Sequence, residues 1–303
     1  MSLHPHLHLL VPSNDPAVLV EARIYLPIDP SDSKLPSVIS TSVAARQPSI
    51  LRYTHLPDEI VQSLKRFNVR RVIAVGHPWG RLGGDMLDPV LSRHLIQSVY
   101  SPEGIAASTG DSKKPALPTA VVTYNVRGVG ASQGYTAWVT PGNDPADFAA
   151  VEQRTINLLC GDAEVEVRRL GYSWGCISAV LAPVPSPSAD ASRLRSIMLV
   201  SPPLSFLPAV TLFSGSYDAA LRRLLSKPQA PPLGAKPINE LVSVWTIYGD
   251  RDQFASIAKY TKWATGHGLK VKEVLADHFW RGDVEAKELR GWFAEWLGHG
   301  VGG

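Results

Sequence analysis

The pentapeptide Gly-Tyr-Ser-Trp-Gly at residues 171–175 constrains the fold more than any other part of this sequence. It stands between a β-like run at 165–170 and an apolar, helix-like run at 174–181. A turn that joins a strand directly to a helix leaves little room for side chains, which favours glycine at positions 171 and 175. Such a turn exposes Ser173 at its tip and points the N-terminus of a helix towards it, where negative charge is favoured.

Strand-like and helix-like segments alternate along most of the chain. The expected strands lie at 18–27, 71–75, 120–124, 165–170, 196–200, 244–248 and 269–275. The expected helices lie at 58–67, 85–107, 147–159, 174–181, 217–225, 254–265 and 284–297. Continuous apolar strands that alternate with helices predict an α/β fold with a mostly parallel central sheet and helices on both of its faces.

The length of 303 residues is compatible with one domain over residues 1–303. Residues 202–241 contain several prolines and a single expected helix, which predicts a small lid over a site. Residues 28–57 are rich in Pro and Ser and are expected to form an insertion, while 108–118 forms an enlarged polar loop.

Composition and charge exclude several classes of function. The net charge is +3 and no long block of Lys and Arg occurs, so we expect no nucleic-acid partner. No stretch approaches the roughly 20 apolar residues that cross a bilayer, and the first residues do not resemble a signal peptide. The two cysteines, Cys160 and Cys176, form no Cys-x-x-Cys pair and are typical of free thiols. We therefore expect a cytoplasmic protein without a membrane segment.

Three histidines alternate near the start of the chain, at His4, His6 and His8. Alternation places them on one face of a strand, a pattern that could bind a metal ion. No carboxylate partner is evident further along, and a surface strand edge is the favoured interpretation. We expect no metal site.

A serine hydroxyl is a poor nucleophile unless a base removes its proton, so Ser173 requires a histidine and a carboxylate that holds it. Asp250 and Asp252 follow the expected strand at 244–248, and His278 follows the expected strand at 269–275. The carboxyl ends of parallel strands meet at one edge of a sheet. Either aspartate gives the chain order Ser…Asp…His, which is expected for a serine nucleophile on this kind of sheet. Alternatively, the two aspartates lie in a solvated turn and His278 has only a structural role.

The loop at 76–84 reads Gly-His-Pro-Trp-Gly-Arg-Leu-Gly-Gly. A tetrahedral intermediate carries an oxyanion that backbone N–H groups must stabilise. One donor is expected from Trp174, directly after the serine, and a second from this loop. Pro78 has no N–H, so Trp79 is the expected second donor; a loop that serves only to turn the chain is the alternative.

These motifs together resemble the α/β-hydrolase superfamily, over roughly residues 18 to 298. Within it, they are similar to a small-lid branch of predicted serine hydrolases. The motifs that carry this resemblance are His77-Pro78…Gly83-Gly84, Asn125–Ser132, Gly171–Gly175, Gly249…Asp252 and Asp277-His278. The resemblance implies a Ser173–His278–Asp252 triad, in which Asp252 is the acid rather than Asp250. It also implies that the Asn125–Ser132 loop is structural, with Arg127 paired to a carboxylate.

The glycines at 128, 130 and 134, in and just after the Asn125–Ser132 loop, resemble a dinucleotide-binding pattern. Its spacing is one residue too long, and no acidic residue follows where a ribose would need one. We expect no cofactor.

Trp79, Trp174 and Trp280 stand beside the expected oxyanion donors and base, and His77 precedes them in the early loop. They would line an apolar pocket, with His77 and Trp280 as its candidate residues. Equally, Trp174 and Trp280 would pack as core beneath the site.

The combined pattern predicts a carboxylesterase-like serine hydrolase that cleaves an ester or thioester of a small apolar molecule. An acyltransferase or lyase on the same scaffold, or a catalytically silent binding protein, stays open. Cys176 is a weaker candidate nucleophile because it lies inside the helix start. Residues 226–237 and the expected lid would control substrate choice, and the sequence names neither the substrate nor the oligomeric state.

Overall fold

The computed structural model describes residues 6–27, 50–101, 117–138, 140–160, 164–184, 192–210, 215–226 and 242–299. His4, most of the expected insertion (28–49), most of the polar loop (to 116), the loop at 185–191 and residues 227–241 of the expected lid lie outside this part. The same holds for the last residues, 102–107, of the expected helix at 85–107.

In the described part of the chain, nine strands form one sheet in the order β3-β1-β2-β5-β4-β6-β7-β8-β9. β2 is antiparallel to both of its neighbours, β1 and β5, and every pair from β5 through β4 to β9 is parallel. The mostly parallel sheet predicted from the sequence is confirmed. The strands are β1 (Leu7–Pro12), β2 (Leu19–Tyr25), β3 (Leu51–Arg52), β4 (Arg71–Gly76), β5 (Thr119–Tyr124), β6 (Val165–Tyr172), β7 (Ser192–Val200), β8 (Ser243–Gly249) and β9 (Lys270–Val274).

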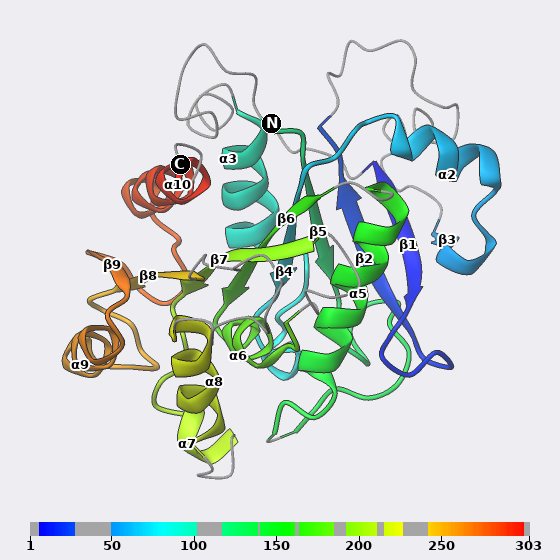
Figure 1. Cartoon of the computed structure of the whole chain (residues 1–303). Helices are drawn as coiled ribbons and strands as arrows, with labels where there is room; N and C mark the ends of the chain where they lie inside the picture. The colour runs from blue at the N-terminus through cyan, green and yellow to red at the C-terminus, as the bar shows by residue number, and fades with distance from the viewer. Residues whose placement is uncertain are drawn as a thin grey trace, which may run out of the picture.

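Helices cover both faces of this sheet (Figure 1). The described helices are α2 (Asp58–Lys65), the π-helix η3 (Val90–Leu95), α3 (Ile96–Tyr100), α5 (Asp144–Leu159), α6 (Gly175–Leu181), α7 (Leu207–Val210), α8 (Ser216–Leu225), α9 (Ile257–His267) and α10 (Asp283–Gly298). Short 3-10 turns, η1 (Tyr53–His55) and η2 (Gly80–Leu82), follow β3 and β4.

The buried side chains form two cores, one on each face of the sheet. Along β4, Val72 and Ala74 join the core of α2, α5, α6 and α8. Ile73 and Val75 join the core of η3, α3 and α10. Because successive strand side chains point to opposite faces, a strand covered on both sides is apolar throughout, which explains the continuous runs in the sequence.

Two helices begin later than the periodicity predicts, and aspartate side chains explain both. Asp88 accepts a hydrogen bond from the N–H of Val90 at 2.9 Å; residues 85–88 are not helical, and the π-helix begins at Val90. Asp252 accepts from the N–H groups of Phe254 and Ala255, at 2.7 and 3.2 Å, and α9 begins only at residue 257. Short polar side chains that bond nearby backbone compete with helix formation.

The central strands bury arginines, which the expectation of apolar strands missed. Arg169 of β6 is fully buried and forms a bidentate ion pair with Glu152 of α5, at 2.7 and 2.8 Å. It also donates to the carbonyl oxygens of Ala182 and Pro183, which follow the last turn of α6, at 2.9 and 2.7 Å. Arg169 therefore ties α5 to the end of the helix that follows the elbow.

A second buried cluster joins β4, β6 and α10. Glu166 accepts hydrogen bonds from Arg71 and Arg168, both buried, and the two positive charges lower the pKa of Glu166 against its burial. Arg168 also donates to the carbonyl oxygens of Trp296 and His299 at the end of α10. Glu166 therefore offsets part of the positive charge of the two arginines, and Arg168 satisfies carbonyl groups at a helix C-terminus.

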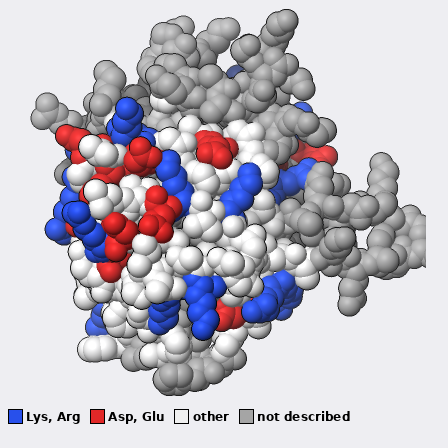
Figure 2. All heavy atoms as spheres, turned by 90° about the vertical axis from the view of Figure 1, so that its left-hand side faces the viewer, with Lys and Arg blue, Asp and Glu red and all other residues white. Residues whose placement is uncertain are grey.

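The face that carries β9, α9 and α10 shows Lys and Arg beside Asp and Glu, around a broad area that carries neither (Figure 2). Neither sign forms a continuous patch on this face. Among the described residues, no helix is long and apolar enough to cross a membrane.

Candidate active site

Ser173 lies at the tip of a strained turn between β6 and α6. Its φ of +52° is in the left-handed region, which a residue other than glycine rarely adopts. A Cβ atom on Gly171 would come within 2.4 Å of Cys176, and one on Gly175 within 2.1 Å of the carbonyl oxygen of Gly76. The two glycines therefore let the turn close and let β4 pack against the start of α6, as the sequence predicts.

The structure brings Ser173, His278 and Asp252 into one chain of hydrogen bonds. Oγ of Ser173 lies 2.9 Å from Nε2 of His278, and Nδ1 of His278 lies 2.7 Å from Oδ2 of Asp252. The side chains of His278 and Asp252 are 3% and 0% exposed. A buried carboxylate that accepts from Nδ1–H leaves Nε2 free to accept the serine proton.

The surroundings distinguish Asp252 from Asp250. Oδ1 of Asp252 accepts the two backbone N–H groups after it, and Oδ2 accepts the hydroxyl of Tyr260 at 3.0 Å as well as His278. Oδ1 of Asp250 instead accepts the N–H of Ala276, at 3.2 Å, in the loop before His278. Asp252 is therefore the carboxylate that orients the imidazole, and Asp250 braces the loop.

Two further residues position His278, and sequence reasoning missed both. Tyr172, the residue before Ser173, donates its hydroxyl to the carbonyl oxygen of His278 at 2.9 Å. The side chain of Gln253 accepts the N–H of His278 at 3.2 Å. Both are short-range neighbours of predicted site residues along the chain, which is the only sequence signal they carry.

The loop after β4 lies against the elbow, as the oxyanion prediction requires. The indole rings of Trp79 and Trp174 stack with centroids 5.0 Å apart and an interplanar angle of 13°. Within the described residues, no hydrogen bond is made by the backbone N–H of either tryptophan. Trp174 is the residue before the first turn of α6, where backbone N–H groups lack helical partners. The role of these two N–H groups as oxyanion donors stays a prediction.

The indole ring of Trp174 forms a hydrogen bond with a buried carboxyl group. Its indole N–H donates to Oδ2 of Asp144, the first residue of α5, at 3.0 Å. Burial raises the pKa of Asp144 from 3.8 to about 6, although the hydrogen bond from Trp174 opposes the shift. The charge on this group therefore changes within the range in which enzymes are commonly assayed.

His77 and Trp280, the candidate pocket residues, lie in the interior. Nε2 of His77 accepts the N–H of Val126 at 3.0 Å, Nδ1 bonds the carbonyl oxygen of Pro78, and burial lowers the pKa of His77 to about 4. Trp280 is 2% exposed, and its indole N–H donates to Ser201 at 3.1 Å. Both side chains are committed to the packing beneath the site, so we place neither in a pocket.

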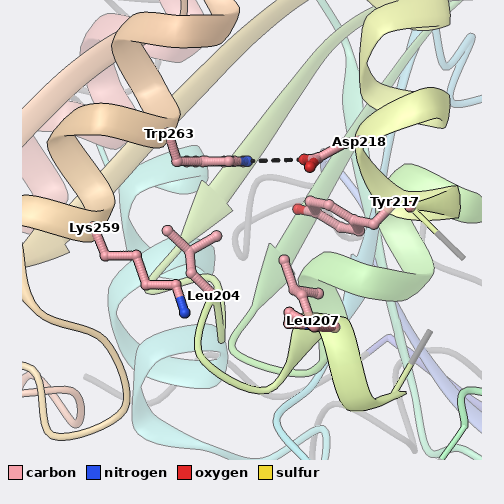
Figure 3. A pocket seen from close by; sticks show the side chains of 8 residues that line it. Leu204, Leu207, Tyr217, Asp218, Lys259 and Trp263 are labelled. Atoms are coloured by element: carbon pink, nitrogen blue, oxygen red, sulfur yellow. Dashed lines mark hydrogen bonds between the residues drawn. The ribbon is translucent and has the colours of Figure 1, made fainter. Parts of the chain in front are cut away.

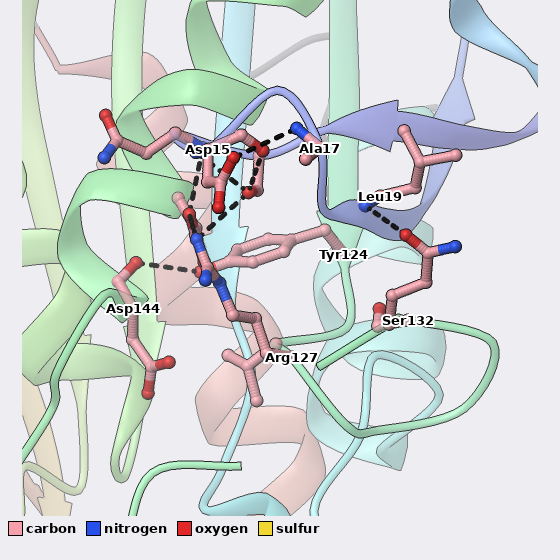
Figure 4. A network of polar contacts seen from close by, with 12 residues as sticks. Asp15, Ala17, Leu19, Tyr124, Arg127, Ser132 and Asp144 are labelled. Atoms are coloured by element: carbon pink, nitrogen blue, oxygen red, sulfur yellow. Dashed lines mark hydrogen bonds and ion pairs between the residues drawn. The ribbon is translucent and has the colours of Figure 1, made fainter. Parts of the chain in front are cut away.

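The polar side chains of the Asn125–Ser132 loop form hydrogen bonds and an ion pair with other parts of the protein (Figure 4). Arg127 forms a bidentate ion pair with Asp147 of α5, at 2.7 and 3.0 Å, as the resemblance implies. Asn125 donates to Glu21 of β2 at 2.8 Å and accepts the N–H of Met86 at 2.9 Å. Through Asn125, the loop joins β2 to the segment that follows the oxyanion loop.

The expectation that no carboxylate faces the N-terminal histidines is wrong. Nε2 of His8 lies 2.6 Å from Oε1 of Glu21, and both side chains are buried. Burial raises the pKa of Glu21, but hydrogen bonds from His8, Ala131 and Asn125 outweigh it and lower the pKa to about 2. His6 instead accepts the N–H of Leu26, at 2.9 Å. No group of three metal-ligating side chains occurs among the described residues.

The rings of Phe254 and Phe279 lie against His278, and Phe206 lies against Phe254 in turn. The ring of Phe254 meets the imidazole edge-on, with centroids 4.4 Å apart. Phe206 and Phe279 lie 5.9 and 6.2 Å from Phe254, and they are 48% and 40% exposed. Two aromatic rings therefore contact the imidazole, and one of them is partly exposed to solvent.

No protein-family model matches this chain, and no curated protein sequence matches it. Solved structures do resemble it. An α/β serine hydrolase homologue from Coxiella burnetii is 15% identical, with 93% of each chain covered and a TM-score of 0.54. A serine hydrolase without a lid from Xanthomonas campestris is also 15% identical, with 97% of this chain and 94% of that chain covered and a TM-score of 0.53. With the sheet order, these likenesses show that the chain has the α/β-hydrolase fold.

Proposed function

We propose that the protein is a carboxylesterase-like serine hydrolase that cleaves an ester or thioester of a small apolar molecule. The observation that carries this proposal is the hydrogen-bonded chain from Ser173 through His278 to Asp252, at 2.9 and 2.7 Å. The fold by itself does not assign a reaction, whereas this geometry is what an activated serine requires.

In the proposed reaction, Oγ of Ser173 attacks the carbonyl carbon while Nε2 of His278 takes its proton. Asp252 stabilises the imidazolium that forms. The N–H groups of Trp79 and Trp174 hold the oxyanion, which collapses as the leaving alcohol or thiol takes the proton from Nε2. Water then attacks the acyl-enzyme, His278 takes a proton from it, and the carboxylic acid leaves with Ser173 restored.

The aromatic surroundings of His278 support an apolar substrate. Phe254 and Phe279 lie against the imidazole and Phe206 lies against Phe254, and the rings of Phe206 and Phe279 are half-exposed. An apolar acyl or alcohol group that lies against these rings removes their surface from water, which stabilises the bound substrate by about 25 cal/mol per Å² of apolar area.

The predicted lid over 202–241 and the single domain over 1–303 stay predictions. Within the described residues, α8 packs its face of Tyr217, Ala220, Leu221 and Leu224 into the core beside α6.

Covalent labelling tests the proposal. A fluorophosphonate probe is expected to label the wild-type protein and not Ser173→Ala, and hydrolysis of p-nitrophenyl butyrate is expected to disappear in the same variant. Cys176→Ala is the matched control, because this thiol, three residues after Ser173, is fully buried and donates to the carbonyl oxygen of Gly171. Absence of labelling between about pH 6 and 9, where a histidine base is largely neutral, would overturn the proposal.

A further inference from the structure

The chain turns in a strained conformation at Ser201, directly after β7. Ser201 has a φ of +46°, in the left-handed region, although it is not glycine and is fully buried. Trp280, two residues after His278, has a φ of +55° and is 2% exposed. Such conformations persist only where the surrounding structure holds them, and they cluster at functional sites. The strain at both residues therefore has to be offset by their contacts.

The two strained residues are bonded to one another. The indole N–H of Trp280 donates to Oγ of Ser201 in the interior, at 3.1 Å. Trp280 also belongs to the same tight turn as His278. Oδ1 of Asp277 accepts the backbone N–H groups of Phe279 and Trp280, at 2.8 and 2.9 Å, and so closes this turn. A displacement of the Trp280 indole therefore moves the turn that carries His278.

The neighbours of this serine in the chain contact the rest of the candidate site. The carbonyl oxygen of Val200 accepts the backbone N–H of Ser173 at 2.9 Å. The hydroxyl of Tyr260 lies 2.9 Å from the carbonyl oxygen of Pro202 and 3.0 Å from Oδ2 of Asp252, so it bridges the two. Three consecutive residues after or at the end of β7 thus reach all three members of the hydrogen-bonded chain.

The segment is itself fixed on both sides. Before it, β7 lies inside the sheet between β6 and β8, and the N–H of Ser201 donates to the carbonyl oxygen of Ile247 at 2.9 Å. After it, Leu204 and Leu207 are buried in the same core as α8, and they line a hollow together with Trp263 of α9 (Figure 3). Residues 200–202 can therefore act as a fixed support for the loops that they contact.

We propose that residues 200–202 form a positioning segment, which sets the places of Ser173, His278 and Asp252 relative to one another. Ser201 is its central side chain, because its hydroxyl holds the turn of the histidine. The segment takes no part in bond making or breaking and acts through the residues that it holds. The inference rests on the proposed function, since a misplacement of about 1 Å slows a reaction only where these groups react.

Labelling by a fluorophosphonate probe and hydrolysis of p-nitrophenyl butyrate test this segment. Ser201→Ala is expected to lower the rate constant of labelling and kcat about tenfold with KM unchanged, because the unpartnered indole lets the histidine turn shift. Ser201→Gly also lacks the hydroxyl but accepts a positive φ, so it is expected to show the same loss without added strain. Ser196→Ala is the matched control, since Ser196 is a buried serine of β7 whose hydroxyl has no partner among the described residues, and it is expected to match the wild type.

A double-mutant cycle separates positioning from general packing. Trp280→Phe keeps an aromatic ring, removes the N–H donor and is expected to slow labelling about tenfold. If both losses come from the one hydrogen bond, the double variant Ser201→Ala/Trp280→Phe is about as slow as the slower single variant, and not about a hundredfold slower than the wild type. Losses that multiply would mean that the two side chains act independently, and would overturn the proposal.

The position of the imidazole is measured independently of activity. Long-range ¹H–¹⁵N NMR correlations report which nitrogen of His278 carries the proton, and His278→Gln assigns the signals. At about pH 9, where a histidine is largely neutral, the wild type and Ser196→Ala are expected to show the Nδ1–H tautomer, and Ser201→Ala a mixture of both tautomers.

These measurements distinguish the two proposals. Absence of labelling in the wild type would overturn the proposed function, and with it a role of the segment in catalysis, even where the spectra change as expected. Labelling of the wild type, with unchanged rates and spectra in Ser201→Ala and Ser201→Gly, would overturn this inference alone. An equal loss in Ser196→Ala and Ser201→Ala would also overturn it.

Discussion

The hydroxyl of Tyr260 lies 3.0 Å from Oδ2 of Asp252, the same carboxylate oxygen that accepts Nδ1–H of His278. The hydroxyl also reaches the carbonyl oxygen of Pro202, at 2.9 Å. Tyr260 therefore links α9 to the loop after β7 and holds Asp252 in the rotamer that faces His278. It touches no reacting atom and is a positioning residue.

Tyr260→Phe is expected to lower kcat roughly three- to tenfold and leave KM unchanged, because the carboxylate loses one of its four donors but keeps its place. Steady-state kinetics with a p-nitrophenyl ester measure both constants. Tyr248→Phe is the matched control: its ring stacks on Tyr260 at 4.3 Å, and its hydroxyl bonds Thr261 instead of Asp252. An equal loss in both variants would mean that the hydroxyl on Asp252 has no special role.

Replacing the two aspartates after β8 separates their roles. Asp252→Asn is expected to lower kcat about 10³- to 10⁴-fold, because an amide at this place favours the wrong tautomer of His278. Asp250→Asn is expected to stay close to the wild type, since the amide oxygen still accepts the N–H of Ala276. Single-turnover rates of acylation report the difference. A greater loss in Asp250→Asn than in Asp252→Asn would contradict the assignment.

Phe206→Ala is expected to reduce the preference for p-nitrophenyl hexanoate over acetate about three- to tenfold. The side chain is half-exposed beside Phe254, so its loss removes apolar contact area with the acyl chain and leaves the core intact. The ratio of the two kcat/KM values is the measurement. Val284→Ala, which truncates an exposed side chain on α10, serves as the control, and an unchanged ratio in Phe206→Ala would place the acyl chain elsewhere.

Arg169→Met is expected to lower the free energy of unfolding by about 3–5 kcal/mol, because Glu152 keeps a buried charge without its partner. Urea unfolding followed by circular dichroism measures this change. The double variant with Glu152→Met is expected to recover part of the loss, since the uncompensated charge is then removed. Arg222→Met, at an exposed position of α8, controls for loss of an arginine, and an equally stable Arg169→Met would contradict the buried pair.

Asp144→Asn is expected to change how stability depends on pH. The pKa of Asp144 is raised from 3.8 to about 6, so the folded state binds its proton more tightly than the unfolded state does. The tighter binding of this proton stabilises the folded state fully below about pH 4, and this stabilisation is lost as the pH rises through about 6. The asparagine variant should therefore exceed the wild type by about 1–3 kcal/mol at pH 8 and lose that advantage at pH 4. A constant difference between the two in urea unfolding would refute the shift.

The sequence by itself determined what depends on local patterns. The Gly171–Gly175 turn, the alternation of strands and helices, and the order of the polar residues after the strands all come from short segments. Because parallel strands end at one edge of a sheet, these patterns also predicted that Ser173 and His278 would meet.

Only the tertiary structure decided the contacts between segments that are far apart in the chain. No local periodicity or spacing in the sequence indicates the hydroxyl of Tyr260 on Asp252, the contact between Phe206 and Phe254, or the burial of His77. Burial and charge pairing depend on what the rest of the fold places around a side chain. For that reason Arg169 is a core residue here.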